Sequence, residues 1–192
     1  MLKELKSNIF YEKKPLKFSY GLNLINGDKY ASNSIGKSTF LMILDFIFGG
    51  TDYLTHNQDV IKEMGHHVFE FSFLFNGKNY YFKRGTENNK IFYFCNKNYE
   101  VIEEKTLKEY SKFLKIKYDL EDLPLTFRNT VSLYSRVWGR NNLNPSRPLS
   151  GFHGENKEET MNRLIKLFGK YSPLENAVKK NNEYKTDDQA LK

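Results

Sequence analysis

The sequence predicts a mixed α/β fold, in which short N-terminal strands and a buried helix precede an antiparallel β-meander and a helical region. Residues 40–48 are apolar nearly all round, which is typical of a helix buried on every side. From residue 68 to residue 95 apolar side chains recur with a period of two, interrupted by the hairpin turn Asn76-Gly77. After residue 106 the spacing becomes that of amphipathic helices.

The N-terminal part predicts three short strands. Segments 2–7, 16–20 and 22–26 show β-type alternation or apolar runs, and Gly21 provides a turn between the last two. A polar loop at 27–35 then leads to the apolar helix, which Gly49-Gly50 ends. The polar stretch 51–65 is expected to be a loop.

The remaining elements follow from local signals. Strands are expected at 68–75, 80–83 and 91–95, with polar turns between them. Two helix starts are marked by N-cap pairs, Thr106 with Glu109 and Asn156 with Glu159. A further helix carries an apolar face, and the Asn/Pro/Ser/Gly-rich segment 139–154 reads as a loop. The residues of that apolar face are Phe127, Val131, Tyr134 and Trp138.

Composition limits the class of protein. The chain has 192 residues and a net charge of +7, enough for one domain with a sizeable core and permissive of an acidic partner such as nucleic acid. No apolar run approaches the ~20 residues of a membrane span, and Met1–Phe10 lacks the pattern of a signal peptide. The single cysteine, Cys95, excludes an internal disulfide. A cytoplasmic location without membrane association is therefore expected.

One motif carries chemistry. Residues 31–39, Ala-Ser-Asn-Ser-Ile-Gly-Lys-Ser-Thr, lie between a predicted strand and the buried helix, where a phosphate-binding loop belongs. Backbone N–H groups of the loop and the helix N-terminus would face phosphate oxygens. Lys37 would reach the β- and γ-phosphates, the Ser38 hydroxyl would bind Mg²⁺, and Thr39 would donate to an α-phosphate oxygen. The residues expected to bind Mg-ATP are Asn33, Ser34, Ile35, Gly36, Lys37, Ser38 and Thr39.

The motif departs from the usual pattern at its first position. Ala31 stands where the pattern has glycine, and a Cβ there costs ~1 kcal/mol if the backbone needs a positive φ. Two hypotheses therefore stay open: a working ATP site, or a degenerate loop in a non-catalytic DNA-binding or assembly module.

Residues 21–27 and 33–41 resemble the heads of SMC/RecN/RecF-type ATPases of the ABC superfamily. Two segments are most similar to the coiled-coil ATPases of bacterial three-component ABC-type systems: the sequence Asn-Ser-Ile-Gly-Lys-Ser-Thr and the helix end Asp45–Gly50. Those ATPases are associated with mobile elements and phage defence. The resemblance implies a P-loop NTPase fold, with residues 1–170 as the N-terminal lobe of an ATP-binding head and 171–192 as the start of a coiled-coil helix.

The resemblance also implies parts that this sequence lacks. Such heads hydrolyse ATP with a Walker B Asp-Glu pair and with a signature motif supplied by a partner head. No apolar strand followed by Asp-Glu occurs here, and the signature-like Leu149-Ser150-Gly151 falls in the loop at 139–154 and reads as coincidence. The implied partners are a C-terminal half-head, a second head in a homodimer, and DNA. ATP hydrolysis is expected only when the head is completed and dimerised, so no catalytic residue is assigned.

The sequence gives weaker indications of a functional role for other polar residues. Asp45 is the lone charge in the apolar helix, and a buried carboxylate is more often satisfied by a local hydrogen bond than used in catalysis. Arg128 and Arg136 share a helix face that would be phosphate-facing or simply solvated. His66-His67 lacks further ligands at metal-binding spacing.

Overall fold

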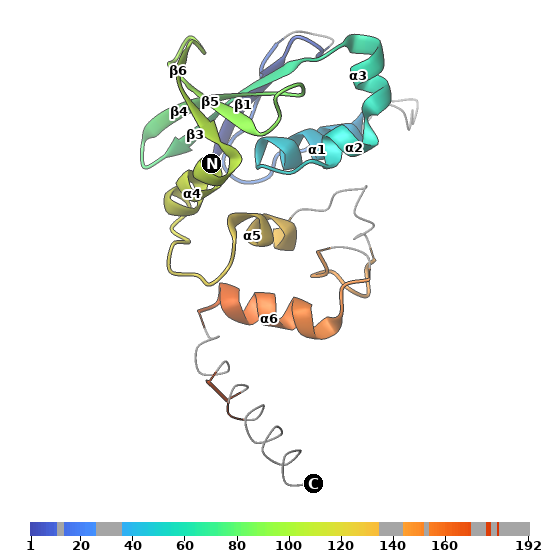
Figure 1. Ribbon diagram of the computed structural model, residues 1–192, viewed down its shortest axis with the longest axis vertical. Helices are drawn as coiled ribbons and strands as arrows, with labels where there is room; N and C mark the ends of the chain where they lie inside the picture. Colours follow the sequence, from blue (N-terminus) through green and yellow to red (C-terminus); the bar gives the residue numbers. More distant parts are fainter. Residues whose placement is uncertain are drawn as a thin grey trace.

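The computed structural model describes residues 1–10, 14–25, 36–134, 144–151 and 154–169, with the isolated residues 176, 177 and 180. It is a mixed α/β fold, as the sequence predicts (Figure 1). The sheet lies on one side of α1 and α2, while α5 and α6 extend away from it (Figure 1). The predicted coiled-coil start at 171–192 lies, apart from three residues, outside the described residues.

Six strands form one antiparallel sheet. Their order is β2-β1-β3-β4-β5-β6, so that β1 and β3, distant in sequence, are neighbours. The strands are β1 (Leu2–Ser7), β2 (Leu16–Lys17), β3 (Val68–Phe75), β4 (Lys78–Gly85), β5 (Ile91–Cys95) and β6 (Val101–Thr106). The predicted turn between β3 and β4 is confirmed, because Asn76 and Gly77 both have the positive φ of a type I′ turn.

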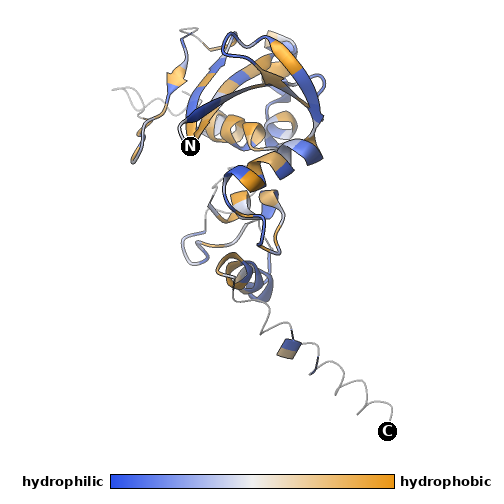
Figure 2. Cartoon of the chain, turned by 90° about the vertical axis from the view of Figure 1, so that its left-hand side faces the viewer, coloured by the Kyte–Doolittle hydropathy of each residue, from blue (hydrophilic) through white to orange (hydrophobic). Residues whose placement is uncertain are grey.

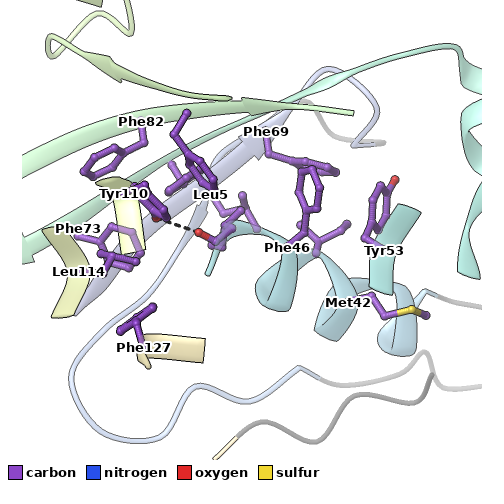
Figure 3. Close-up of a cluster of buried hydrophobic side chains, with 14 of the residues drawn as sticks. Leu5, Met42, Phe46, Tyr53, Phe69, Phe73, Phe82, Tyr110, Leu114 and Phe127 are labelled. Carbon is purple, nitrogen blue, oxygen red and sulfur yellow. Dashed lines mark hydrogen bonds between the residues drawn. The ribbon is translucent and has the colours of Figure 1, made fainter. Parts of the chain in front are cut away.

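Helix α1 (Lys37–Ile47) packs against the inner face of the sheet (Figure 2). It is the helix predicted from the apolar run, and it begins three residues earlier, at Lys37. The Phe46 ring packs against the Phe69 and Tyr53 rings, with ring centroids 5.8 and 5.7 Å apart (Figure 3). Inward side chains at alternate positions of β3 and β4 complete this core. The fully buried members are Leu5, Phe46, Ile47, Tyr53, Phe69, Phe71, Phe73, Phe82, Phe92, Tyr110 and Leu114.

The capped helices are confirmed. In α4 (Leu107–Lys117) the Thr106 hydroxyl accepts from the Glu109 N–H while the Glu109 carboxylate accepts from the Thr106 N–H, the full capping box. In α6 (Lys157–Leu167) the Asn156 side chain accepts from the Glu159 N–H at 2.7 Å. Helix α5 (Phe127–Tyr134) also forms and contains Phe127, Val131 and Tyr134 of the predicted apolar face, while Trp138 lies outside the described residues.

Three predictions are wrong. Residues 22–25 do not form a strand, because no described strand lies beside them to pair with. The predicted loop at 51–65 instead contains two helices, α2 (Asp52–His56) and α3 (Gln58–Met64). Helix α2 is stabilised by the burial of Tyr53 in the core. The segment 16–20 pairs only at Leu16 and Lys17, so the predicted strand is shorter.

Candidate functional site at the start of helix α1

The first turn of α1 holds the described part of the predicted phosphate-binding motif. Gly36 has φ 76° and ψ 14°, a left-handed conformation that favours glycine, and it passes the chain directly into the helix. Lys37 and Ser38 are exposed, and no acidic residue lies in the first turn. Asn33, Ser34 and Ile35, like Ala31, lie outside the described residues.

The electrostatics of this end suit an anion. The first intrahelical bond runs from the Phe40 N–H to the Gly36 carbonyl at 2.7 Å, so the N–H groups ahead of it have no partner inside the helix. Those groups and the helix dipole present a partial positive charge beside the Lys37 amine. The Lys37 amine forms no ion pair with any residue that the structure describes. The arrangement can therefore bind phosphate oxygens.

A hollow of about 670 Å³ adjoins this turn. Gly36, Lys37 and Thr39 line one part of it, and apolar side chains form most of the rest. Two of those side chains, Phe18 and Phe40, stack with ring centroids 6.4 Å apart and an interplanar angle of 20°. The apolar wall beside a cationic end suits a ligand that combines a flat apolar part with an anionic part.

Thr39 is used differently from the sequence-based expectation. Its hydroxyl donates to Asn57 Oδ1 at 3.2 Å, on the side of α1 that faces α2 and α3. A hydroxyl has one proton, so in this arrangement the Thr39 side chain has none to donate to an α-phosphate. Its backbone N–H remains available to a phosphate.

The opposite end of α1 is anchored by three side chains from three other elements. Arg84 of β4, fully buried, donates to the carbonyls of Phe46 and Gly50, the latter at 2.8 Å. Tyr110 of α4 donates to the Ile47 carbonyl at 2.8 Å (Figure 3). These bonds satisfy carbonyls that a helix C-terminus leaves without partners, and the cation complements the dipole.

Arg128 of α5 is the third anchor. Its Nη1 donates to the Phe48 carbonyl at 3.1 Å, and its Nη2 forms an ion pair with Asp45 Oδ1 at 2.5 Å. Asp45 is buried, and its carboxylate pairs with a side chain of another helix, 83 positions away, where the sequence suggested a local hydrogen bond. Arg128 therefore has a structural contact here, while Arg136 lies outside the described residues.

Sequence reasoning did not single out Arg84. The alternation of β4 places Arg84 on the same inward face as Phe82, and this spacing of two residues could have predicted that the Arg84 side chain is buried. Burial lowers the pKa of the Arg84 guanidinium to about 10, because desolvation disfavours its charged form. The guanidinium carbon lies 3.8 Å from the centroid of the Phe46 ring, which compensates part of that penalty.

The signature-like segment has a local structural role. The Gly151 N–H donates to Glu155 Oε2 at 2.7 Å, and Glu155 forms a buried ion pair with Arg163 of α6. Arg163 also donates to the Ser132 hydroxyl of α5 at 2.8 Å, which ties the segment to both helices. Among the described residues, no group of three or more His, Cys, Asp and Glu side chains is placed to hold a metal ion.

An apolar segment stands exposed just before the motif. Leu22 is 87% exposed and Leu24 is 72% exposed, in a stretch without regular secondary structure. The side chain of Asn23 bonds the carbonyls of Ser19 and Gly21 and so shapes the turn ahead of it. No helix within the described residues is both long and apolar enough to cross a membrane.

Comparison with protein-family models, with curated proteins and with solved structures finds no match to this chain.

Proposed function

We propose that this chain binds Mg-ATP at the start of α1 and forms the N-terminal lobe of a P-loop, ABC-type ATPase head. The observation that carries the proposal is the junction at Gly36. A left-handed glycine leads into an exposed Lys-Ser pair at the positive end of an 11-residue helix. Lys37 meets the terminal phosphates and Ser38 contributes a hydroxyl to Mg²⁺.

The exposed apolar segment 22–25 supports the proposal that this lobe is completed by a second half of the ATPase head. Apolar residues on both faces of an extended segment are typical of a strand buried within a parallel sheet. The six described strands instead form an antiparallel sheet that does not include this segment. A C-terminal half-head, in the same protein or in a second chain, would pair with it and add the missing acidic residues. In this proposal two completed heads dimerise around ATP and act on DNA, in DNA maintenance or in defence against phage and mobile elements.

Calorimetric titration of Mg-ATP tests the site. Lys37→Ala removes charge-assisted contacts worth about 3 kcal/mol, so we expect at least a hundredfold loss of affinity with the fold intact. The matched control is Lys97→Ala, an exposed lysine in the turn between β5 and β6, and it should bind ATP like the wild type. Unchanged binding in Lys37→Ala would contradict the site and favour the alternative, a non-catalytic DNA-binding or assembly module with a degenerate loop.

The isolated chain should release phosphate from ATP at close to the background rate. Hydrolysis needs an acidic group to orient water and charge stabilisation from a partner head, and neither is provided by the proposed site. A malachite-green phosphate assay measures this directly. Robust turnover by these 192 residues that Lys37→Ala abolishes would contradict the half-head proposal.

A further inference from the structure

The side chain of Asn57 makes unusual contacts for a residue at the start of a helix. It ends α2 and precedes the first residue of α3, a place where asparagine commonly caps the following helix. Its side chain makes no such capping bond and is instead 5% exposed, turned toward α1. The capping stabilisation given up at α3 implies that the inward contacts are the more important ones.

The amide of Asn57 bridges the first turns of α1. Its Nδ2 donates to the Tyr53 carbonyl at 3.1 Å and contacts Met42 Sδ at 3.3 Å. The carbonyl only accepts, so Nδ2 must face it and Oδ1 must face Thr39. The Thr39 hydroxyl must therefore donate to Asn57, which fixes the rotamer of Thr39.

The bridge is anchored to the sheet through Tyr53. Tyr53 is fully buried, and its hydroxyl lies 2.7 Å from His67 Nε2. The other ring nitrogen of His67 donates to the Gly65 carbonyl at 2.9 Å, which leaves Nε2 as the acceptor for the Tyr53 hydroxyl. Tyr53 thus bonds to His67, the residue preceding β3, through its hydroxyl and to Asn57 through its backbone carbonyl, and Asn57 in turn bonds to Thr39.

Within the part of the chain that the structure describes, the first turn of α1 packs through Phe40, which stacks on Phe18, and is otherwise mostly exposed. The buried residues of α1 begin only at Met42, while Lys37 and Ser38 are exposed. We infer that Asn57 is a positioning residue for the nucleotide site, holding the phosphate-binding turn of α1 in place through the Thr39 hydroxyl. This inference rests on the proposed function and assigns Thr39 a role behind the turn, away from the ligand.

A double-mutant cycle on Mg-ATP affinity tests the inference. Thr39→Val and Asn57→Leu each remove the bond with little change of volume, and each should weaken binding about three- to tenfold, the equivalent of one buried hydrogen bond. The double variant should be no weaker than the weaker single variant, because both remove the same contact. Thr39→Ser keeps the hydroxyl and should retain wild-type affinity.

Tyr110→Phe is the matched control. It removes one buried hydrogen bond to the same helix at the opposite end, so urea unfolding should show a stability loss while ATP affinity stays within twofold. An Asn57→Leu variant that behaves like this control, destabilised but with unchanged affinity, would overturn the inference. A loss in Thr39→Val with none in Asn57→Leu would also overturn it, since the hydroxyl would then contact the phosphate directly.

The outcomes separate this inference from the proposed function. If the wild type does not bind ATP, or if Lys37→Ala binds equally well, the nucleotide site itself is wrong. If Lys37→Ala abolishes binding and the cycle shows no effect, the site stands and only the role of Asn57 fails. Should Asn57→Leu not fold, Asn57→Ala takes its place in the cycle, because Thr39→Val by itself does not distinguish a bond to Asn57 from a bond to phosphate.

Discussion

Replacing Arg84 by methionine should destabilise the whole fold, because this side chain joins the sheet to the end of α1. Its guanidinium donates to three backbone carbonyls, those of Phe46, Gly50 and Asn89. Methionine keeps the apolar stem and the contact with the Phe46 ring but donates nothing. The three carbonyls would then be left without this donor in or near the core.

The magnitude follows from two opposing contributions. The carbonyls of Phe46 and Gly50 are buried, whereas that of Asn89 is only half-buried and can bond to water. Losing two buried hydrogen bonds from a charged donor costs about 6 kcal/mol at about 3 kcal/mol each. The variant also removes a buried cation, whose pKa of about 10 reflects a desolvation penalty on the order of 3 kcal/mol that folding no longer carries. We therefore expect a net loss of about 3 kcal/mol in the free energy of unfolding.

Urea unfolding followed by circular dichroism measures this loss at a constant m-value. For a domain of this size the melting temperature should fall by roughly 6–12 °C. Lys83→Met is the matched control, since Lys83 is the neighbouring residue of β4 on the outer face and pairs with Glu70 at 2.6 Å. A surface ion pair contributes about 0–1 kcal/mol, so this control should change little. An Arg84→Met variant as stable as Lys83→Met would refute the reasoning.

Two further predictions concern buried hydrogen bonds. Tyr110→Phe should lower the free energy of unfolding by about 1–2 kcal/mol, because the Ile47 carbonyl loses its donor; an unchanged urea midpoint would contradict this. Burial lowers the pKa of His67 below its ordinary 6.5, so the unfolded chain takes up the proton first and stability should fall as the pH drops below about 6.5. His67→Gln should remove this part of the pH dependence, and a wild-type slope in that variant would assign it to other groups.

Local signals in the sequence were sufficient for elements whose cause is local. The turn at Asn76-Gly77 forms because both residues tolerate positive φ, whatever surrounds them. The capping box at Thr106 and Glu109 closes between residues three apart, so it also needs no tertiary partner. The apolar run of α1 could be identified because nearly every face of that helix carries apolar side chains.

Contacts between distant residues decided the rest. Segment 22–25 has the composition of a strand, but a strand forms only where another strand completes its hydrogen bonds, and none of those described lies beside it. Strand β6 reads as charged and exposed, and it forms through pairing with β5. The polar sequence around Tyr53 becomes helical through burial of that one ring.

The candidate site also combines features that the sequence predicts with features that depend on tertiary contacts. The sequence by itself was sufficient to propose phosphate chemistry at Gly36, Lys37 and Ser38, because a turn of this kind is built from consecutive residues and their backbone N–H groups. Only the tertiary structure decided what holds that turn, since Asn57 contacts Thr39 across 18 positions of the chain and Arg84 reaches the Phe46 carbonyl across 38. Such partners depend on which elements pack together, and no spacing along the chain encodes them.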